Sequence, residues 1–139
     1  MSAPYRTGLV WFRRDLRAED HAALHHALQQ CQQVHCAFVF DRAILDPLPR
    51  RDRRVEFIRE SLVELDSRLR TLARHPQAGL IALHGQADSL IPNLALALGA
   101  DAVFTHHDDE PAALARDARV RTQLALQRQA LHTYQDHTV

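Results

Sequence analysis

The chain has no lysine and few glycines. Among its 139 residues there are four glycines, and neither the G-x-G-x-x-G nor the G-x-x-x-x-G-K-[ST] pattern occurs. Those patterns place backbone N–H groups around the phosphates of dinucleotides and of ATP. Their absence argues against a standard dinucleotide site or a P-loop. No serine lies in a G-x-S-x-G elbow and no convincing catalytic triad is present, so the sequence does not predict a catalytic nucleophile.

Excess charge, paired cysteines and long apolar runs are also missing. All 17 basic residues are arginines, and 17 acidic residues balance them to a net charge of zero. A domain that binds nucleic acid by itself is usually basic, so this chain is a poor candidate. Cys31 and Cys36 match no zinc or redox spacing and form no disulfide framework. Without a signal peptide pattern, or an apolar run near the roughly 20 residues of a membrane span, we expect a cytoplasmic protein with no membrane partner.

The sequence alternates between strand and helix patterns over a length typical of one domain. This alternation predicts a parallel sheet with right-handed crossovers and helices on both faces. We therefore expect one α/β domain over 1–139, a three-layer α/β/α fold with a five-stranded parallel Rossmann-like sheet. The last strand is short and polar, which suits an edge. The predicted strands lie at about 8–12, 34–40, 80–84, 101–105 and 130–134, and the predicted helices at about 20–31, 50–74, 87–98 and 112–128.

The first strand runs directly into a charged segment. The apolar run Leu9–Phe12 is typical of a strand buried on both faces, and Arg13, Asp15 and Arg17 follow it. In open α/β sheets, ligands bind at the carboxyl edge of the strands. The segment is therefore a candidate edge for a ligand or a second domain. The alternative is a solvated loop in which Asp15 holds the turn or caps the next helix.

A second basic cluster, Arg50–Arg54, opens the longest predicted helix. Positive charge there opposes the helix dipole at a modest cost. A solvated first turn is one interpretation. A contact with an anionic ligand or with another domain is the other, and we favour it slightly.

The segment His106–Pro111 follows the fourth strand and opens the last helix. It contains two histidines and three carboxylates. We do not expect a metal site, because His106 and His107 are adjacent in a strand-like segment and point to opposite sides. A carboxylate at this helix start is able instead to accept paired hydrogen bonds from the N–H edge of a pterin or deazaflavin ring. The alternative is a carboxylate that caps its own helix.

Several blocks, in the same order, resemble the N-terminal domain of the DNA photolyase/cryptochrome family, and together they span nearly the whole chain. The first resembles the family signature Trp-Phe-Arg-x-Asp-Leu-Arg, and another resembles Glu-Pro followed by Arg-Asp. The matching blocks are Leu9–Arg17, Asp20–Leu24, Val39–Asp41, Arg54–Leu65, Gly85 with Asp88, and Val103–Asp117. Three positions depart from the pattern. His106 and His21 replace asparagines, and Asp109 replaces a tyrosine; the changes at 106 and 109 alter the expected antenna pocket.

The resemblance implies a light-harvesting role. In this family the N-terminal α/β domain carries an antenna chromophore: a folate, a deazaflavin or sometimes a flavin. A larger helical C-terminal domain, which we expect to be absent from this chain, carries FAD and contacts damaged DNA. That domain would be this domain's partner within the same polypeptide. The parent enzyme would be a deoxyribodipyrimidine photolyase, a carbon–carbon lyase, while this portion would have no catalytic residue and no metal. The implied cofactor-binding residues are Arg13, Phe40, Asp41, Arg54, Asp108 and Glu110.

Three alternatives remain open. The domain could belong to a cryptochrome photoreceptor without repair activity. It could be a small nucleotide-binding regulatory module, although the glycine-rich loop of such a module is missing. It could also fold and bind nothing without its helical partner.

Overall fold

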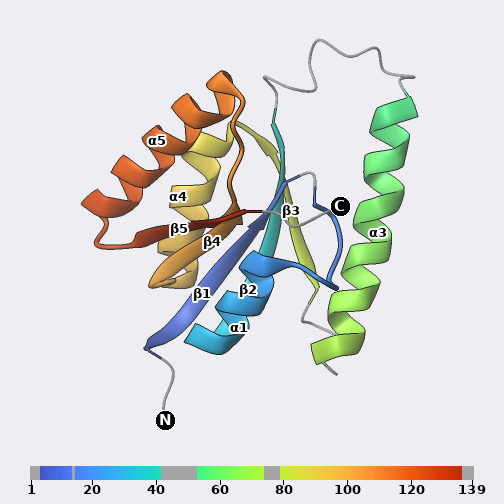
Figure 1. Ribbon diagram of the computed structural model, residues 1–139, viewed down its shortest axis with the longest axis horizontal. Helices are drawn as coiled ribbons and strands as arrows, with labels where there is room; N and C mark the ends of the chain where they lie inside the picture. Colours follow the sequence, from blue (N-terminus) through green and yellow to red (C-terminus); the bar gives the residue numbers. More distant parts are fainter. Residues whose placement is uncertain (1–3, 14, 42–52, 74–78, 136–139) are drawn as a thin grey trace.

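The computed structural model describes residues 4–13, 15–41, 53–73 and 79–135, with side chains in the long helix described from residue 56 onward. Five parallel strands form one sheet in the order β3-β2-β1-β4-β5 (Figure 1). The expected fold is confirmed. The elements are β1 Tyr5–Phe12, α1 Ala22–Gln30, β2 Cys31–Asp41, α3 Arg53–Ala73, β3 Leu80–Gly85, α4 Ala87–Leu98, β4 Ala102–His106, α5 Pro111–Leu126 and β5 Ala130–Tyr134.

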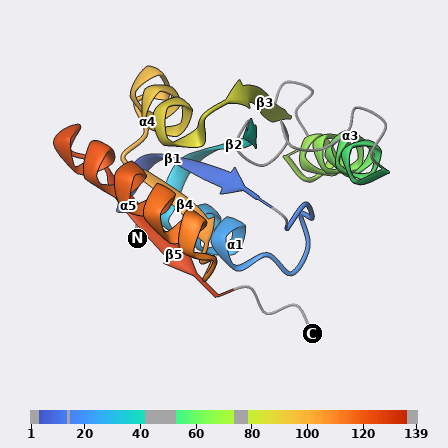
Figure 2. The same cartoon turned by 90° about the horizontal axis from the view of Figure 1, so that it is seen from above.

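The sheet is the middle of three layers. Helices α1 and α3 lie on one face, and α4 and α5 lie on the other (Figure 2). Side chains alternate along β1, so Val10 and Phe12 enter the core beneath α1 and α3, while Leu9 and Trp11 enter the core beneath α4 and α5. Both faces exclude water, which explains why this strand is an unbroken apolar run.

The strand order reverses beside β1. The chain first moves outward from β1 to β2 and β3, then crosses back to place β4 on the other side of β1. The connections that leave the carboxyl ends of β1 and β4 therefore diverge onto opposite faces of the sheet. A crevice at such a switch point is the usual ligand position in open α/β sheets. The segments 13–21 and 107–110 both begin there.

The ends of the elements follow local chemistry. Gly99 ends α4 in the left-handed conformation with φ of 66°, and Pro111 opens α5, where its missing N–H costs no hydrogen bond. Strand β5 lies at an edge, as its polar sequence predicts. Strand β2 begins at Cys31, immediately after α1 and earlier than the predicted start at 34. No helix in the described part of the chain is long and apolar enough to cross a membrane.

Candidate functional site

A pocket of about 490 Å³ opens at the switch point between β1 and β4. Its walls come from the segment after β1 and from the segment that joins β4 to α5. The lining residues are Arg13, Asp15, His106, His107, Asp108, Asp109, Glu110 and Pro111. Two of the three clusters that the sequence singled out therefore meet in one cavity, although they are far apart in the chain.

The two terminal nitrogens of the Arg13 guanidinium are both engaged by protein groups. Its Nη1 donates to the His106 carbonyl oxygen at 2.7 Å, and its Nη2 pairs with the carboxylate of Asp117 on α5. Its Cζ also lies 4.2 Å from the centre of the Trp11 ring, within the range of a cation–π contact. Arg13 therefore ties β1, β4 and α5 together and offers little free positive charge to a ligand.

A second arginine lies over the same tryptophan. The Cζ of Arg116 is 5.1 Å from the Trp11 ring centre, and Arg116 Nη1 lies 3.5 Å from a carboxylate oxygen of Asp41 at the end of β2. Asp41 and Asp117 are both buried and balance the two guanidinium groups. Asp41, which the sequence placed in the ligand wall, thus holds α5 against the sheet and does not line the pocket.

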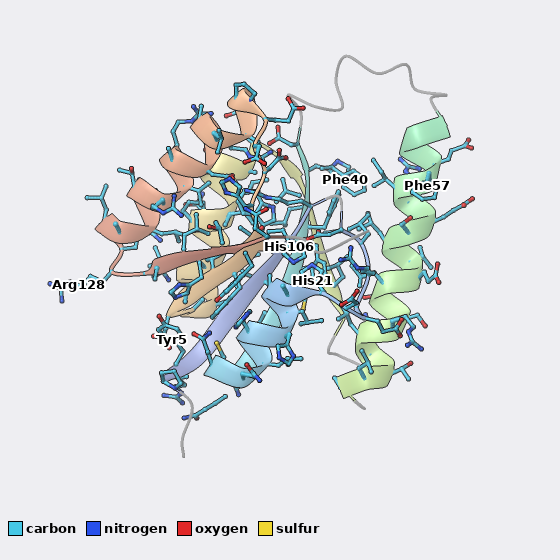
Figure 3. All side chains as sticks on the ribbon, viewed as in Figure 1. Tyr5, His21, Phe40, Phe57, His106 and Arg128 are labelled. Atoms are coloured by element: carbon cyan, nitrogen blue, oxygen red, sulfur yellow. The ribbon has the colours of Figure 1, made fainter. Side chains whose placement is uncertain are left out.

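The pocket floor contains a buried carboxylate between two imidazoles. Asp15 Oδ2 lies 2.9 Å from His21 Nε2 and also contacts His106 Nδ1. Asp15 Oδ1 accepts the backbone N–H of Arg13 at 2.8 Å. The rings of His21 and His106 stack with centres 4.0 Å apart, at the start of α1 in Figure 3. Burial alone would raise the pKa of Asp15, but hydrogen bonds from His106, His21 and Arg13 more than offset it and hold that pKa well below its usual range.

Both imidazoles also cap α1. His21 is the N-cap residue, and its Nδ1 accepts the backbone N–H of Leu24 at 3.0 Å; His106 Nε2 accepts the backbone N–H of Ala23 at 3.2 Å. Asp15 itself makes no cap; it holds the turn after β1. Of the two roles that the sequence left open for Asp15, the turn is confirmed.

The Asp15, His21 and His106 side chains form the group of potential metal ligands found among the described residues. A ligating histidine must offer a lone pair to the metal and normally donates its other ring N–H to an acceptor. Here the outer nitrogens face backbone N–H groups of α1, which only donate. The arrangement therefore fits a carboxylate with two neutral imidazoles better than it fits a metal. His107 is not part of this group and pairs with the exposed Asp109 at 2.8 Å.

The pocket rim is acidic. Asp108 Oδ1 accepts the Glu110 backbone N–H at 2.9 Å, which leaves its second oxygen unused by that turn. Glu110 is the N-cap residue of α5, but its side chain makes no capping hydrogen bond. The structure thus excludes the capping alternative for the Glu110 side chain. These two carboxylates are hydrogen-bond acceptors that an external N–H donor is able to reach.

Besides Asp41, one further expected site residue lies elsewhere, and the side chain of another is outside the described residues. Phe40 is buried on the α1 and α3 face, where its ring stacks on His84 with centres 4.5 Å apart, and Figure 3 shows it directed toward α3. The side chain of Arg54, like every other side chain of the cluster Arg50–Arg54, is outside the described residues. The pocket therefore brings together Arg13, Asp108 and Glu110 from the expected set.

The roles of His21, Asp117 and Trp11 were not predicted from the sequence. A signal for His21 was present, because His21 and His106 are two of the three departures from the family pattern, and the structure stacks these two rings against each other. Asp117 ends the block that resembles the family's Glu-Pro and Arg-Asp pattern, but nothing in the sequence indicated that its partner is Arg13, from the other end of the chain.

Comparison with known proteins now identifies the family. The DNA photolyase family model matches residues 8–139. The deoxyribodipyrimidine photo-lyase of a Synechococcus species is 37% identical over 126 residues, covering 89% of this chain and 24% of that protein. Cryptochrome-2 of Gallus gallus is 31% identical over 110 residues, covering 79% of this chain and 18% of that protein. Among solved structures, the archaeal photolyase from Sulfolobus tokodaii, determined with two FAD molecules, matches with a TM-score of 0.82 and 28% identity.

That structural match covers 95% of this chain and 30% of the archaeal chain. The chain thus spans about a quarter of the photolyase relative and less of the cryptochrome. It belongs to the DNA photolyase family and has the fold of that family's N-terminal α/β domain.

Proposed function

We propose that this domain holds a planar antenna chromophore in the pocket between β1 and β4. The observation that carries the proposal is the position of Asp108 and Glu110, two acceptor groups on the rim of a cavity at the switch point of the sheet. A folate or deazaflavin ring presents N–H donors along one edge, and ionised carboxylates only accept hydrogen bonds. When bound, such a ring supplies light absorption, while the protein supplies shape and orientation.

The charge of the lining favours a ring without a phosphate tail. Arg13 is engaged by Asp117, and His107 by Asp109, so the described lining offers no uncommitted cation. Three carboxylates lie along the rim. We expect riboflavin to bind more tightly than its 5′-phosphate, by about tenfold or about 1.4 kcal/mol. The same repulsion argues against the nucleotide-binding module, whose ligand carries phosphates.

The test is a titration of the chain with a folate, a deazaflavin and riboflavin, monitored through Trp11, and with ATP, monitored by calorimetry. Trp11 is the single tryptophan, and its ring contacts Arg13 on the pocket wall. A chromophore in the pocket therefore quenches tryptophan emission by energy transfer. We expect Glu110→Gln and Asp108→Asn to weaken binding of a ring. Asp101→Asn is the matched control, because Asp101 accepts backbone N–H groups at the opposite end of β1.

Two results would contradict the proposal. Ring binding that is unchanged in both rim variants would remove the acceptor role. Tight ATP binding with no response to any ring would favour the regulatory module.

We further propose that the full-length protein is a photolyase in which a C-terminal helical domain carries FAD and contacts damaged DNA. The 37% identity to a photolyase supports this assignment. The 31% identity to a cryptochrome supports the alternative of a blue-light receptor. Light-driven loss of pyrimidine dimers, assayed with the full-length protein, separates the two, because a receptor without repair activity leaves the dimers intact.

A further inference from the structure

We propose that Asp15, His21 and His106 form a proton-operated latch between the pocket floor and the first turn of α1. With one proton on each imidazole the latch is closed, which means that both rings accept a backbone N–H group of the first turn of α1. A further proton on either ring breaks the capping hydrogen bond of that ring. The latch needs no chromophore, so it stands independently of the proposed antenna role.

The proton count follows from the hydrogen-bond partners. The backbone N–H groups of Leu24 and Ala23 point at His21 Nδ1 and His106 Nε2, respectively. A backbone N–H only donates, so each of these ring nitrogens must carry a lone pair. The single proton of each ring therefore lies on the nitrogen that faces Asp15, namely His21 Nε2 and His106 Nδ1. In this state both ring N–H groups face the ionised Asp15 carboxylate, and the other two ring nitrogens accept N–H groups of α1.

An additional proton has only one place to bind on each ring. It must take the nitrogen that faces α1, where it would meet an N–H group head-on. The cap hydrogen bond to Leu24 or Ala23 then breaks, and the first turn of α1 loses a partner for a buried donor. Because the two rings stack with centres 4.0 Å apart, two positive charges there repel each other, so a proton on one ring disfavours a second proton on the other.

The charged groups of β1, β2 and α5 around the latch are paired with one another, so the two imidazoles are the groups that take up a proton when the pH falls. Asp15 stays ionised in mild acid, because the same hydrogen bonds that define the latch hold its charged form. From β1, Arg13 contacts the carbonyl of His106 and is paired with Asp117 of α5. From β2, Asp41 lies against Arg116 of α5. From the segment after β4, His107 pairs with Asp109, and Asp108 and Glu110 line the same pocket as His106.

Amide hydrogen exchange of the complete chain tests the latch at the two backbone amides that the imidazoles cap, those of Ala23 and Leu24. Histidine is the side chain that ordinarily gains a proton between about pH 8 and pH 5. Loss of an N-cap corresponds to about fivefold to tenfold in local stability. We therefore expect protection of the Ala23 and Leu24 amides, corrected for intrinsic exchange, to fall by about that factor over this range, while Ile91 in α4 keeps its protection.

Asparagine variants separate the cap made by His21 from the cap made by His106. His21→Asn removes the titrating partner of Leu24, so only Ala23 should remain pH-dependent; His106→Asn should give the reverse. His25→Asn is the control, because His25 lies on the same helix but is exposed. The latch is wrong if neither amide responds to pH in the wild type, or if both still respond in the double variant.

A second measurement does not depend on any variant folding. Imidazole nitrogen chemical shifts of the wild type at about pH 8 report which ring nitrogen carries the proton. We expect the proton on Nε2 of His21 and on Nδ1 of His106; the opposite tautomers would overturn the latch.

Binding of one Zn²⁺ per chain that is lost in His106→Asn would also overturn the latch, and it would assign the three side chains to a metal site instead.

Discussion

Replacing Asp15 with asparagine tests the buried network most directly. Asparagine has the same shape, and its oxygen is still able to accept the Arg13 N–H now bound by Oδ1. Its amide nitrogen, however, takes the place of Oδ2 and presents two donors to the N–H groups of His21 and His106. Neither imidazole can avoid this conflict by moving its proton, because the other nitrogen faces a donor from α1.

The magnitude follows from counting the donors left without acceptors. Two buried N–H groups lose their partner, and each unsatisfied buried donor costs about 1–3 kcal/mol. We therefore expect Asp15→Asn to lower the free energy of unfolding by about 2–6 kcal/mol. A domain of this size typically has about 5–15 kcal/mol in total. The change should appear as a large shift in the urea midpoint at pH 7, measured by circular dichroism.

Asp101→Asn is the matched control for stability. The exposed Asp101 accepts two backbone N–H groups through Oδ2, and an asparagine oxygen is able to keep them. We expect a loss below about 1 kcal/mol. Equal, small losses in both variants would refute the account of Asp15 as the acceptor on which the network depends.

Three further predictions concern pH and packing. The pKa of Asp15 is lower in the folded protein than in the unfolded chain, so the ionised carboxylate stabilises the fold above about pH 4, and this stabilisation is lost as pH falls. In urea titrations, the loss of unfolding free energy caused by Asp15→Asn should therefore be about 1 kcal/mol smaller at pH 3 than at pH 5. Gly8→Ala would place a methyl group 2.5 Å from the Cys31 sulfur and should cost about 1–3 kcal/mol; the double variant with Cys31→Ala should recover part of that loss, and a strictly additive result would contradict the clash. In α4, Ile91→Ala should cost about 2–5 kcal/mol by thermal or urea unfolding, whereas Leu96→Ala, at a position 60% exposed, should cost well under half as much; similar losses would argue against the burial assigned to this helix.

Much of the fold was predictable because it depends on local patterns. The run Leu9–Phe12 marks a strand buried on both faces, and β1 is such a strand. Gly99 and Pro111 mark helix ends through backbone constraints that do not depend on distant residues. The alternation of strands and helices then leaves few parallel topologies.

The candidate site was predictable only in part. Arg13, Asp108 and Glu110 follow strand ends, and parallel strands bring their carboxyl ends to one edge of a sheet. The sequence did not indicate that Phe40 lies in the core beneath α1 and α3. It also did not indicate that side chains of α5 engage Arg13 and Asp41. Those outcomes depend on which helix covers which face, and a pattern within one segment does not carry that information.

The sequence by itself determined the α/β class, the positions of the strands and the family, because hydrophobic periodicity and local motifs are written into neighbouring residues. Only the tertiary structure decided that Asp15, His21 and His106 share a buried site. Each of these polar side chains has an ordinary surface role when considered alone. They acquire a common role because the reversal of strand order beside β1 brings β4 and the start of α1 to the same carboxylate.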